Sequence, residues 1–347
     1  MADRAETILE VRNLHTHFHT ESGVVRALEG VDFTLNRGQV LGVVGESGCG
    51  KSVTAQCIMN MVPSRGRIVD GSVIYHQRNG QGTEAVEITA LPPKSREMRR
   101  IRGNEIAMIF QEPMTSLDPL YTVGNQLLEA INLHQDVDRT EARALAVHSL
   151  DRVQLPEPER VFASYPHQLS GGQRQRVMIA IALSCNPTLL IADEPTTALD
   201  VTTQAQILSL MRDLQDETHM SIIFITHDLG VVAEMCDEVA VMYLGKVVEQ
   251  TDIDTTFYSP KHPYTQALLR SIPRLEDDQD RRLEVIAGSV PDPSSIPSGC
   301  RFHPRCPDFV TGVCEQREPV LVQIEKDHQV RCHLYDETAS SQPGTQP

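Results

Sequence analysis

The sequence predicts an α/β fold: a parallel sheet flanked by helices, interrupted by a helical insert and followed by a C-terminal extension. Three observations carry this prediction. Apolar runs of strand length alternate with helix-patterned segments, which is the order expected of a buried parallel sheet. A glycine-rich loop, GESGCGKS at 45–52, stands between one such run and a helical segment. From residue 259 onward the chain is rich in proline and carries four of its eight cysteines, which indicates a change of structural unit.

The first part of the chain, residues 8–43, has the pattern of short strands that lead into the glycine-rich loop. The apolar segment SVTAQCIMNMV, which begins at Ser52, is expected to be a helix. Between about residues 75 and 103 the sequence becomes polar and rich in glycine and arginine. We therefore expect an exposed insertion there.

A helical stretch is predicted from residue 123 to about residue 153, where apolar residues recur three and four positions apart. Prolines between 156 and 166 then break the pattern. These segments make up a helical insert that spans about residues 112–180. The strand-like runs TLLIAD (188–193) and SIIFITH (221–227) enclose one more helix, so the parallel sheet is expected to resume after the insert.

The domain boundary is predicted between residues 258 and 259. Residues 1–258 would form the α/β domain, and residues 259–347 a separate extension. The extension contains an acidic run, EDDQD at 276–280, and ends in DETASSQPGTQP, a polar tail that we expect to be disordered.

Composition narrows the classes of function. A chain of 347 residues with 40% hydrophobic content can form one large core and a smaller appendage. Its formal net charge of −16 argues against a nucleic-acid partner, whose phosphates require clustered lysine and arginine. Its apolar runs are far shorter than the ~18 residues that cross a bilayer. We therefore expect a cytosolic protein that serves a membrane process only by docking on other subunits.

The loop GESGCGKS matches G-x-x-x-x-G-K-[ST] between a strand and a helix, which is the context in which this pattern binds nucleotide phosphates. Its glycines let backbone N–H groups point at the β-phosphate. Lys51 brings a positive charge to the phosphate oxygens, and the Ser52 hydroxyl ligates Mg²⁺. The expected nucleotide-binding residues of this phosphate loop and its helix are Gly45, Glu46, Ser47, Gly48, Cys49, Gly50, Lys51, Ser52 and Val53.

Two acids end the run TLLIADEP at the carboxyl edge of the predicted sheet, where α/β folds bind ligands. Asp193 would hold Mg²⁺ through water, and Glu194 would act as a general base on the attacking water. Gln111 and His227 each follow a predicted strand, so each could contact the γ-phosphate or the water from its own strand end. The predicted catalytic residues are Glu194, His227 and Gln111, and the predicted magnesium ligands are Ser52, Gln111 and Asp193.

A second glycine-rich sequence, LSGGQ at 169–173, opens an apolar helix and also has the character of a phosphate cradle. It has neither a lysine at the spacing of the first loop nor a nearby magnesium ligand, so it can cap a phosphate but cannot run hydrolysis by itself. We infer that it closes over ATP bound by a different subunit. In such a head-to-tail pair, each subunit would give its partner Ser170, Gly171, Gly172 and Gln173.

Together, GESGCGKS, Gln111, LSGGQ, LLIADEP, TALD at 197–200 and His227 occur in the order and spacing of the ATP-binding cassette (ABC) family. The chain resembles this family over about residues 8–258. The resemblance implies a P-loop NTPase core with ATP and Mg²⁺ as cofactors.

Further roles are implied by the same resemblance. Phe18 would stack on the adenine, Leu199 and Asp200 would line the dimer seam, and the segment after Gln111 would touch the membrane subunits. Cys49 stands where relatives more often have serine, so we expect activity with some sensitivity to thiol reagents.

The extension resembles that of the oligopeptide/dipeptide importer branch, in SPKHPYTQALLRSIP (259–273) and SGCRFHPRCPDFVTGVCEQREP (298–319). Its cysteines are separated by five, seven and seventeen residues, unlike the C-x-x-C pairs of zinc ribbons. The resemblance implies a [4Fe–4S] cluster, with structural zinc and unligated thiols as alternatives and His303 or His333 as possible substitute ligands. The predicted cluster ligands are Cys300, Cys306, Cys314 and Cys332.

The predicted function is ATP hydrolysis that energises an ABC importer, most directly for di- or oligopeptides. The subunit would pair with a homologous second ATPase subunit and act on two membrane permease subunits, which an extracytoplasmic substrate-binding protein supplies. It would lie peripherally on the cytoplasmic face of the membrane. The alternatives are the same machinery importing nickel, opines or oligosaccharides, and a non-transport ABC ATPase, which the acidic charge disfavours.

Overall fold

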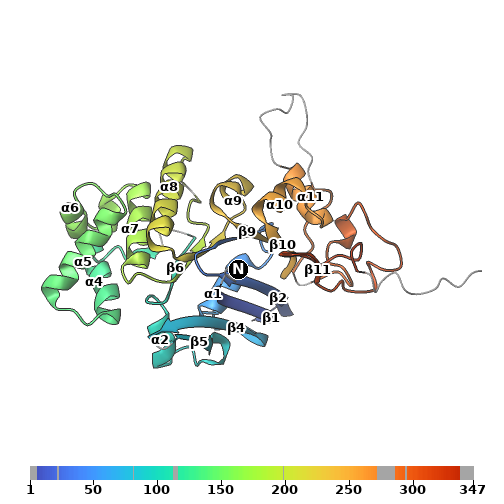
Figure 1. Ribbon diagram of the computed structural model, residues 1–347, viewed down its shortest axis with the longest axis horizontal. Coiled ribbons are helices and arrows are strands. Elements are labelled where there is room, and N and C mark those ends of the chain that lie inside the picture. The colour runs from blue at the N-terminus through green and yellow to red at the C-terminus, as the bar shows by residue number, and fades with distance from the viewer. Residues whose placement is uncertain are drawn as a thin grey trace, which may run out of the picture.

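The computed structural model describes residues 6–21, 23–80, 82–111, 116–197, 199–271, 286–293 and 295–336. The body is elongated: helices of residues 123–183 form an arm at one end, the C-terminal extension forms the other, and two sheets lie between them (Figure 1). The predicted acidic run at 276–280 and residues 337–347 of the predicted tail lie outside the described residues.

The larger sheet contains eight of the described strands, in the order β11-β12-β10-β9-β3-β8-β7-β6. The strands from β9 to β6 are parallel, as predicted, and the remaining three pair antiparallel. Each of β3, β7 and β8 is a five-residue run that is buried throughout, because helices and a second sheet cover its two faces. The bounds are β3 (Val40–Val44), β6 (Ile106–Ile109), β7 (Leu189–Asp193), β8 (Ser221–Ile225), β9 (Glu238–Tyr243), β10 (Lys246–Asp252), β11 (Val322–Glu325) and β12 (His328–Val330).

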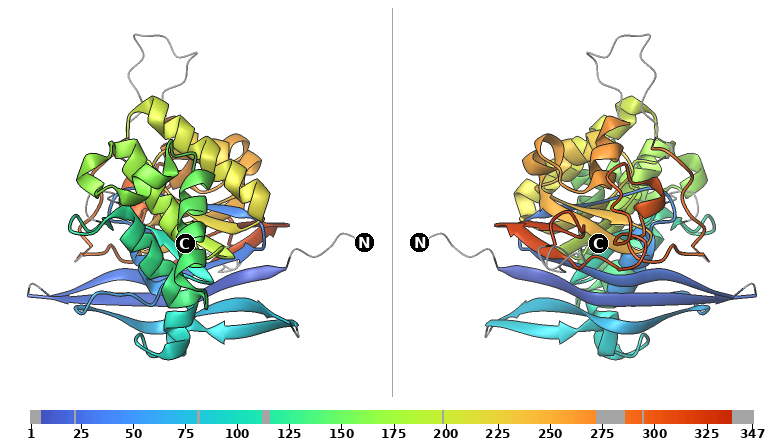
Figure 2. Two further views of the ribbon diagram at one scale, coloured as in Figure 1. Left: turned by 90° about the vertical axis from the view of Figure 1, so that its left-hand side faces the viewer. Right: turned by 90° about the vertical axis from the view of Figure 1, so that its right-hand side faces the viewer.

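Alternate residues of these strands face two hydrophobic cores. On β8, Ile222 and Phe224 belong to an outer core, whereas Ile223 and Ile225 belong to an inner core between the two sheets. The helices of the arm, α8 (Val201–Thr218) and α9 (Leu229–Met235) cover the outer core, and α1 (Lys51–Ile58) and α2 (Arg96–Ile101) help to fill the inner one. The resulting layers are visible from the side in Figure 2.

The smaller sheet is antiparallel, with the order β2-β1-β4-β5. The exposed insertion predicted for residues 75–103 is confirmed for most of its described residues, but Tyr75, Ile88, Met98 and Ile101 are buried. The Tyr75 hydroxyl lies 2.6 Å from that of Thr188, which ties β4 to the start of β7. Tyr75 pairs with Leu9. Because the two residues are far apart in the chain, the sequence around Tyr75 gives no indication of this pairing. The bounds are β1 (Thr7–Thr20), β2 (Gly23–Asn36), β4 (Gly66–Asn79) and β5 (Gly82–Glu87).

The arm is the predicted helical subdomain. The helical stretch predicted over 123–153 contains two helices, and Asp138 caps the second: its Oδ1 accepts the N–H groups of Thr140 and Glu141 at 2.7 and 2.9 Å. Apolar faces of the arm helices merge with the outer core. The bounds are α4 (Val123–His134), α5 (Arg139–Arg152), α6 (Pro158–Ala163) and α7 (Gly171–Leu183).

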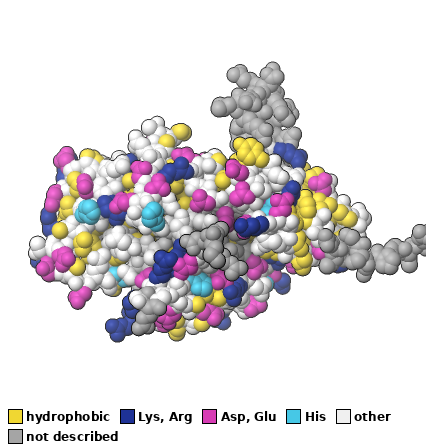
Figure 3. Space-filling model, in the orientation of Figure 1, with side chains coloured by type: hydrophobic (Ala, Val, Ile, Leu, Met, Phe, Trp, Pro, Cys, Tyr) yellow, Lys and Arg dark blue, Asp and Glu magenta, His cyan; other side chains and the backbone are white. Residues whose placement is uncertain are grey.

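The C-terminal extension is continuous with the larger sheet. After α10 (Ile253–Tyr258) and α11 (Pro263–Arg270), the chain returns as β12, which pairs with β10 through Glu249↔Val330. The buried Glu249 carboxylate accepts the backbone N–H of Lys261 at 2.7 Å and of His262 at 3.0 Å, and it pairs with His328 at 2.8 Å. Although predicted as separate, the extension therefore shares a sheet and buried charges with the α/β domain. Hydrophobic side chains gather over its outer end (Figure 3).

Candidate active site

Four strand ends meet at one edge of the larger sheet. β3, β8, β7 and β6 are adjacent and parallel, so the residues that follow their carboxyl ends are neighbours in space. The phosphate loop follows β3, Gln111 follows β6, Asp193 ends β7 and His227 follows β8. The residues predicted from scattered motifs are brought together at this edge.

The phosphate loop folds around the ammonium group of Lys51. This residue is only 6% exposed, and its Nζ donates hydrogen bonds to the carbonyl oxygens of Gly45 at 2.7 Å and Glu46 at 3.3 Å. Gly45 has a φ of +151°, and a Cβ there would lie 2.2 Å from the carbonyl oxygen of Met242, so only glycine fits. The loop thus offers an anion a positive charge and the N-terminus of α1.

The other residues of the phosphate loop differ in exposure, and the burial of Cys49 corrects the predicted sensitivity to thiol reagents. Cys49 is 3% exposed, and burial raises the pKa of its thiol. A buried thiol with a raised pKa is a poor nucleophile, so the expected sensitivity to thiol reagents is not supported by this position. Among the remaining predicted contacts, Gly50 is buried, Glu46, Ser52 and Val53 are half-buried, and Ser47 and Gly48 are exposed.

Ser52 and Asp193 lie together as the predicted magnesium site requires. The Ser52 hydroxyl donates a hydrogen bond to Oδ1 of Asp193 at 3.1 Å. Burial raises the pKa of the Asp193 carboxyl, and the hydrogen bond from Ser52 opposes that shift. A buried carboxylate beside a hydroxyl is a pair of oxygen ligands suited to Mg²⁺, and the cation would stabilise the charge that burial disfavours. Ser52 and Asp193 therefore fit a magnesium ion. The third predicted ligand, Gln111, instead donates a hydrogen bond to Glu194.

Three side chains converge on the carboxylate of Glu194. Gln111 Nε2 donates to Oε2 at 3.0 Å, and the Thr197 hydroxyl donates to the same oxygen at 2.9 Å. His227 Nδ1 lies 3.4 Å from Oε1. Burial raises the pKa of Glu194, but the hydrogen bonds from Thr197 and His227 outweigh it, so the net pKa lies below the ordinary value. Glu194 is therefore ionised at neutral pH, as a general base must be.

Thr197 is a contact to Glu194 that the sequence analysis did not single out. Glu194 adopts a left-handed backbone conformation, with a φ of +47°, which turns the chain sharply after β7. The Thr197 N–H then bonds back to the Glu194 carbonyl at 3.2 Å, and its hydroxyl reaches the carboxylate. A hydroxyl three residues after an acid at a strand end is the signal that could have identified it.

Phe18 lies on β1, opposite Val25 of β2 and Gly66 of β4. Its ring is half-buried and covers Gly66, where a Cβ would lie 2.7 Å from a ring atom. Phe18 belongs to neither of the two cores formed by the described residues. Its stacking on adenine stays a prediction.

The second cradle is a capped helix N-terminus. Ser170 Oγ accepts the Gln173 N–H at 3.3 Å, and Gln173 Oε1 accepts the Ser170 N–H at 2.9 Å, which is the reciprocal arrangement of a capping box. Gly171 has open space where a side chain would be. A Cβ on Gly172, by contrast, would lie 2.8 Å from Cγ2 of Thr203 on α8.

Asp200 caps α8 beside this cradle. Its Oδ1 accepts the Thr203 N–H at 2.9 Å, and its Oδ2 accepts the Thr203 hydroxyl at 2.8 Å. The backbone hydrogen bond from Thr203 lowers the pKa of Asp200. Because Thr203 also contacts Gly172, the predicted seam residues, Leu199 and Asp200, lie next to the second cradle.

The two cradles do not meet within one chain. No hydrogen bond or ion pair of the described residues joins Ser170–Gln173 to the phosphate loop. The two helices that they open, α7 and α1, lie in different parts of the body, the first in the arm and the second near the smaller sheet (Figure 1).

The charges of neighbouring cysteines act on the thiols of Cys306 and Cys332 in the extension. Burial, together with the charges of the other three thiols, raises the pKa of Cys332 to about 12, and burial raises that of Cys306 to about 11. The Cys300 N–H donates to the Cys314 carbonyl at 2.7 Å. In the part of the chain that the structure describes, no three of these sulfurs lie within 4.8 Å of one another; His15, His17 and Glu29 do satisfy that spacing. Four thiolates around one zinc ion would be about 3.8 Å apart.

Two family matches cover most of the chain. Residues 28–197 match the ABC transporter family, and residues 248–314 match the C-terminal region of the oligopeptide/dipeptide transporters. The first match contains Lys51, Ser170 and Glu194, and the second contains all the predicted cluster cysteines except Cys332.

Full-length relatives agree with these matches. The chain is 49% identical over 338 residues to the probable peptide ABC transporter ATP-binding protein y4tR of Sinorhizobium fredii, across 97% of this chain and 98% of that protein. It is also 49% identical over 337 residues to the oligopeptide transport ATP-binding protein AppD of Bacillus subtilis, across 97% and 99%.

Solved structures share the fold. The ATP-binding cassette MJ0796, as a dimer bound to ADP and Pi after hydrolysis, matches with a TM-score of 0.61 and 27% identity over 71% of this chain and 99% of that chain. CbiO1 from Clostridium perfringens, part of the transporter complex cbiONQ, matches with a TM-score of 0.59 and 27% identity over 73% and 92%. From the motifs at one sheet edge, the full-length relatives and these cassettes, we conclude that the chain is an ABC ATPase, a member of the ABC transporter ATP-binding proteins, whose cofactors are ATP and Mg²⁺.

Proposed function

We propose that this chain hydrolyses ATP to energise the import of di- or oligopeptides. The phosphate loop binds the phosphates of ATP, Ser52 and Asp193 hold Mg²⁺, and Phe18 supports the adenine. Glu194 accepts the proton of the attacking water, while Gln111 and His227 orient that carboxylate and the γ-phosphate. The magnesium ion supplies charge neutralisation between the phosphates.

The convergence of Gln111, Thr197 and His227 on Glu194 is the observation that carries this proposal. A carboxylate fixed by three neighbours and kept ionised is prepared to take a proton from water. Asp193, the residue before Glu194, accepts a hydrogen bond from Ser52 of the phosphate loop. The proposed base and the proposed magnesium site are therefore adjacent in the chain.

The exposed cradle at Ser170–Gln173 supports a head-to-tail pair with a second, homologous ATPase subunit. In that pair each cradle caps the γ-phosphate held by the partner, so ATP joins the two subunits and hydrolysis releases them. The cassette MJ0796 is described as a dimer bound to ADP and Pi, which supports the pairing of two cassettes.

Exposed apolar side chains near Gln111 support docking onto two permease subunits. Phe110, Leu120 and Tyr121, which follow β6 and precede α4, are 43%, 79% and 55% exposed. Along the described parts of the chain, no helix combines the length and apolarity needed to cross a membrane. The chain would therefore lie peripherally, at the cytoplasmic face, on those permeases.

The peptide cargo is supported by the C-terminal match and by the names of both relatives. An extracytoplasmic binding protein and the permeases would select the peptide, because the motifs of this chain recognise ATP. Nickel, opines or oligosaccharides remain the alternative cargoes of the same machinery.

We also propose that Cys300, Cys306, Cys314 and Cys332 hold a [4Fe–4S] cluster. The charges of neighbouring cysteines add to the raised pKa values of Cys306 and Cys332, and no three of the four sulfurs lie as close together as one tetrahedral zinc ion requires. A four-iron cluster spreads its thiolate ligands more widely than a single ion does, which favours it over zinc for sulfurs at this spacing. The cluster would supply Fe–S bonds that cross-link the loops of the extension.

Uptake of a labelled peptide by the complete transporter in liposomes tests the function. Wild-type protein should give ATP-dependent uptake, Glu194→Gln should abolish it, and Glu217→Gln, an exposed acid on α8, should not. ATP-dependent uptake of nickel, an opine or an oligosaccharide, but not of peptide, would overturn the peptide assignment alone. Uptake that continues in Glu194→Gln would overturn the role of the site.

A further inference from the structure

A side chain of the extension is bonded to the phosphate loop. The guanidinium of Arg305 donates to both carboxylate oxygens of Glu46, at 2.7 Å to Oε2 and 3.0 Å to Oε1, across 259 positions of the chain. This is the two-bond geometry that gives arginine–carboxylate pairs their strength and fixed orientation. Glu46 is the second residue of the loop, directly after Gly45.

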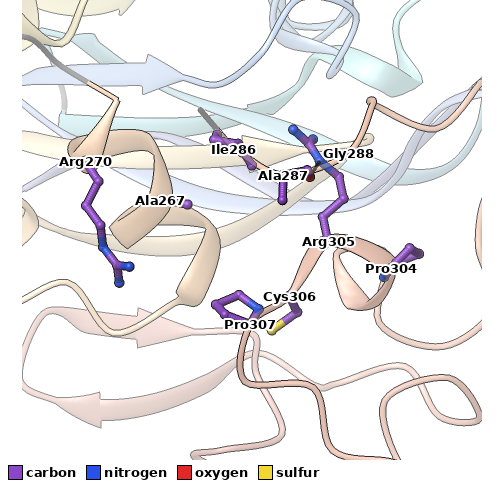
Figure 4. A pocket seen from close by; sticks show the side chains of 9 residues that line it. All are labelled: Ala267, Arg270, Ile286, Ala287, Gly288, Pro304, Arg305, Cys306 and Pro307. Atoms are coloured by element: carbon purple, nitrogen blue, oxygen red, sulfur yellow. Dashed lines mark hydrogen bonds between the residues drawn. The ribbon is translucent and has the colours of Figure 1, made fainter. Parts of the chain in front are cut away.

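The arginine side of the pair is buried and makes further hydrogen bonds. The Arg305 side chain is 4% exposed, its Nε donates to the Ala287 carbonyl at 3.1 Å, and its guanidinium also reaches the Tyr243 hydroxyl at 3.4 Å. Arg305 also lines a cavity of about 360 Å³ with Ala287 and Cys306 (Figure 4). The guanidinium is therefore held in place by a carbonyl of the extension and by a hydroxyl of β9.

A second contact acts on the same loop residue. The hydroxyl of Tyr264, on α11 of the extension, accepts the backbone N–H of Glu46 at 3.0 Å. Tyr264 packs against Tyr243 and Phe302, with ring centroids 4.6 and 5.3 Å away. Both the backbone and the side chain of Glu46 are thus positioned by residues beyond 258.

We propose that Arg305 is a positioning residue for nucleotide binding, through which the cysteine segment of the extension sets the conformation of the phosphate loop. It acts through Glu46 and touches no phosphate itself. The inference rests on the nucleotide site proposed above and adds to it a route from the extension to that site. Cys306 is adjacent to Arg305 and Cys300 lies five residues before it, so ligation that fixes these two sulfurs also fixes the base of the arginine side chain.

Coupling of this kind is reciprocal. If the extension helps to hold the loop in the shape that binds ATP, then ATP binding must in turn stabilise the segment that carries Arg305. A merely structural ion pair would contribute to stability without transmitting nucleotide occupancy to residues 300–306. This difference makes the proposal testable without any measurement of turnover.

The chain contains a matched control. Arg331 is also a residue of the extension, and it pairs with Asp32 of β2 at 3.3 Å. It joins the extension to the α/β domain as Arg305 does, but at a strand outside the phosphate loop. Loss of Arg331 therefore reports the general effect of loosening the extension.

The experiment measures the affinity of a fluorescent ATP analogue and the melting temperature for the full-length chain. Arg305→Ala should weaken nucleotide binding by about 5-fold or more. Arg305→Lys, which keeps the charge but cannot make two parallel bonds, should fall between that variant and wild type. Glu46→Gln should weaken binding in the same way, and Arg331→Ala should bind as wild type does. In hydrogen exchange, ATP should slow the 300–306 segment of wild type and Arg331→Ala but not of Arg305→Ala.

Each of the other possible results would contradict either the inference or the proposed function. Wild-type affinity in both Arg305→Ala and Glu46→Gln would overturn the inference, as would an equal loss in Arg331→Ala. If Arg305→Ala does not fold, Glu46→Gln and its exchange pattern decide. A wild-type chain that binds no ATP would overturn the proposed function itself, so the two failures are distinguishable.

Discussion

Nε2 of Gln111 donates a 3.0 Å hydrogen bond to the carboxylate of Glu194, across 83 positions of the chain. The bond joins the ends of β6 and β7. It also connects the entrance of the helical arm to the proposed general base, because the chain enters the arm just after Gln111.

Replacement of Glu194 by glutamine should separate binding from hydrolysis. The amide keeps the shape of the side chain but cannot accept the proton, so kcat should fall on the order of 10²- to 10⁴-fold while ATP affinity is retained. ATP should then trap a dimer, which light scattering after size-exclusion chromatography would detect. Unchanged turnover would remove Glu194 from the role of base, and Glu217→Gln serves as the control.

Loss of the Lys51 ammonium should weaken nucleotide binding. A hydrogen bond between charged partners contributes about 1.5–3 kcal/mol, so Lys51→Ala should raise the Kd for ATP on the order of 10- to 100-fold. Equilibrium titration with a fluorescent ATP analogue measures this. Tight binding by Lys51→Ala would contradict the assignment of the loop.

Substitutions at the two glycines of the second cradle should have different effects on stability and on hydrolysis. Gly171→Asp has room for its side chain, so the melting temperature should stay close to that of wild type, but hydrolysis should be lost because a negative charge would face the partner's phosphate. Gly172→Ala should instead lower the melting temperature, because its Cβ would lie 2.8 Å from Thr203 Cγ2. The thermal melts and the ATPase rates are compared for both variants.

Mixing variants tests whether the cradle acts across the dimer. In a pair made of one Lys51→Ala chain and one Gly171→Asp chain, one of the composite sites has an intact phosphate loop facing an intact cradle. The mixture should therefore regain hydrolysis that neither variant shows alone. A mixture as inactive as its components would count against the head-to-tail arrangement.

Stability should fall on mild acidification because of His262. Burial lowers the pKa of this imidazole from 6.5 to about 4, and its Nδ1 accepts the Tyr264 N–H at 3.0 Å. The unfolded chain takes up a proton below about 6.5, whereas the folded chain does not until about 4, so acid between these values favours unfolding. The loss between pH 7.5 and 5 should be about 2 kcal/mol.

Thermal or urea unfolding at several pH values measures this contribution. His262→Asn keeps an acceptor at the start of α11 but does not titrate, so its stability should depend less on pH in that window. An identical pH dependence in wild type and variant would assign the effect to other groups.

Metal analysis tests the cysteine cluster. Protein purified without oxygen should be brown and contain four iron atoms per chain if the cluster is [4Fe–4S]. Cys332→Ser should lose the iron, and Cys185→Ser, whose sulfur lies beside the carbonyl of Ala130 in the arm, should keep it. Colourless protein with one zinc ion per chain would refute the iron assignment.

Sequence patterns alone predicted the parallel core and most of the candidate site. Lys51, Asp193 and Glu194 each stand at or just after an apolar run, and the carboxyl ends of neighbouring parallel strands must meet at one edge. Once the strands were identified, the proximity of these residues followed from the fold class. Thr197 could have been added from its spacing to Glu194, because a turn closes over so short a distance.

Other features were decided only by tertiary structure. The pairing of β4 with β1 buries Tyr75 at the start of a segment whose composition indicates exposure, and the pair of Arg305 with Glu46 joins the extension to the loop. Local periodicity and composition report how a segment would fold beside its immediate neighbours. They carry no information on which remote strand or charge will be its partner, because that depends on how the whole chain is packed.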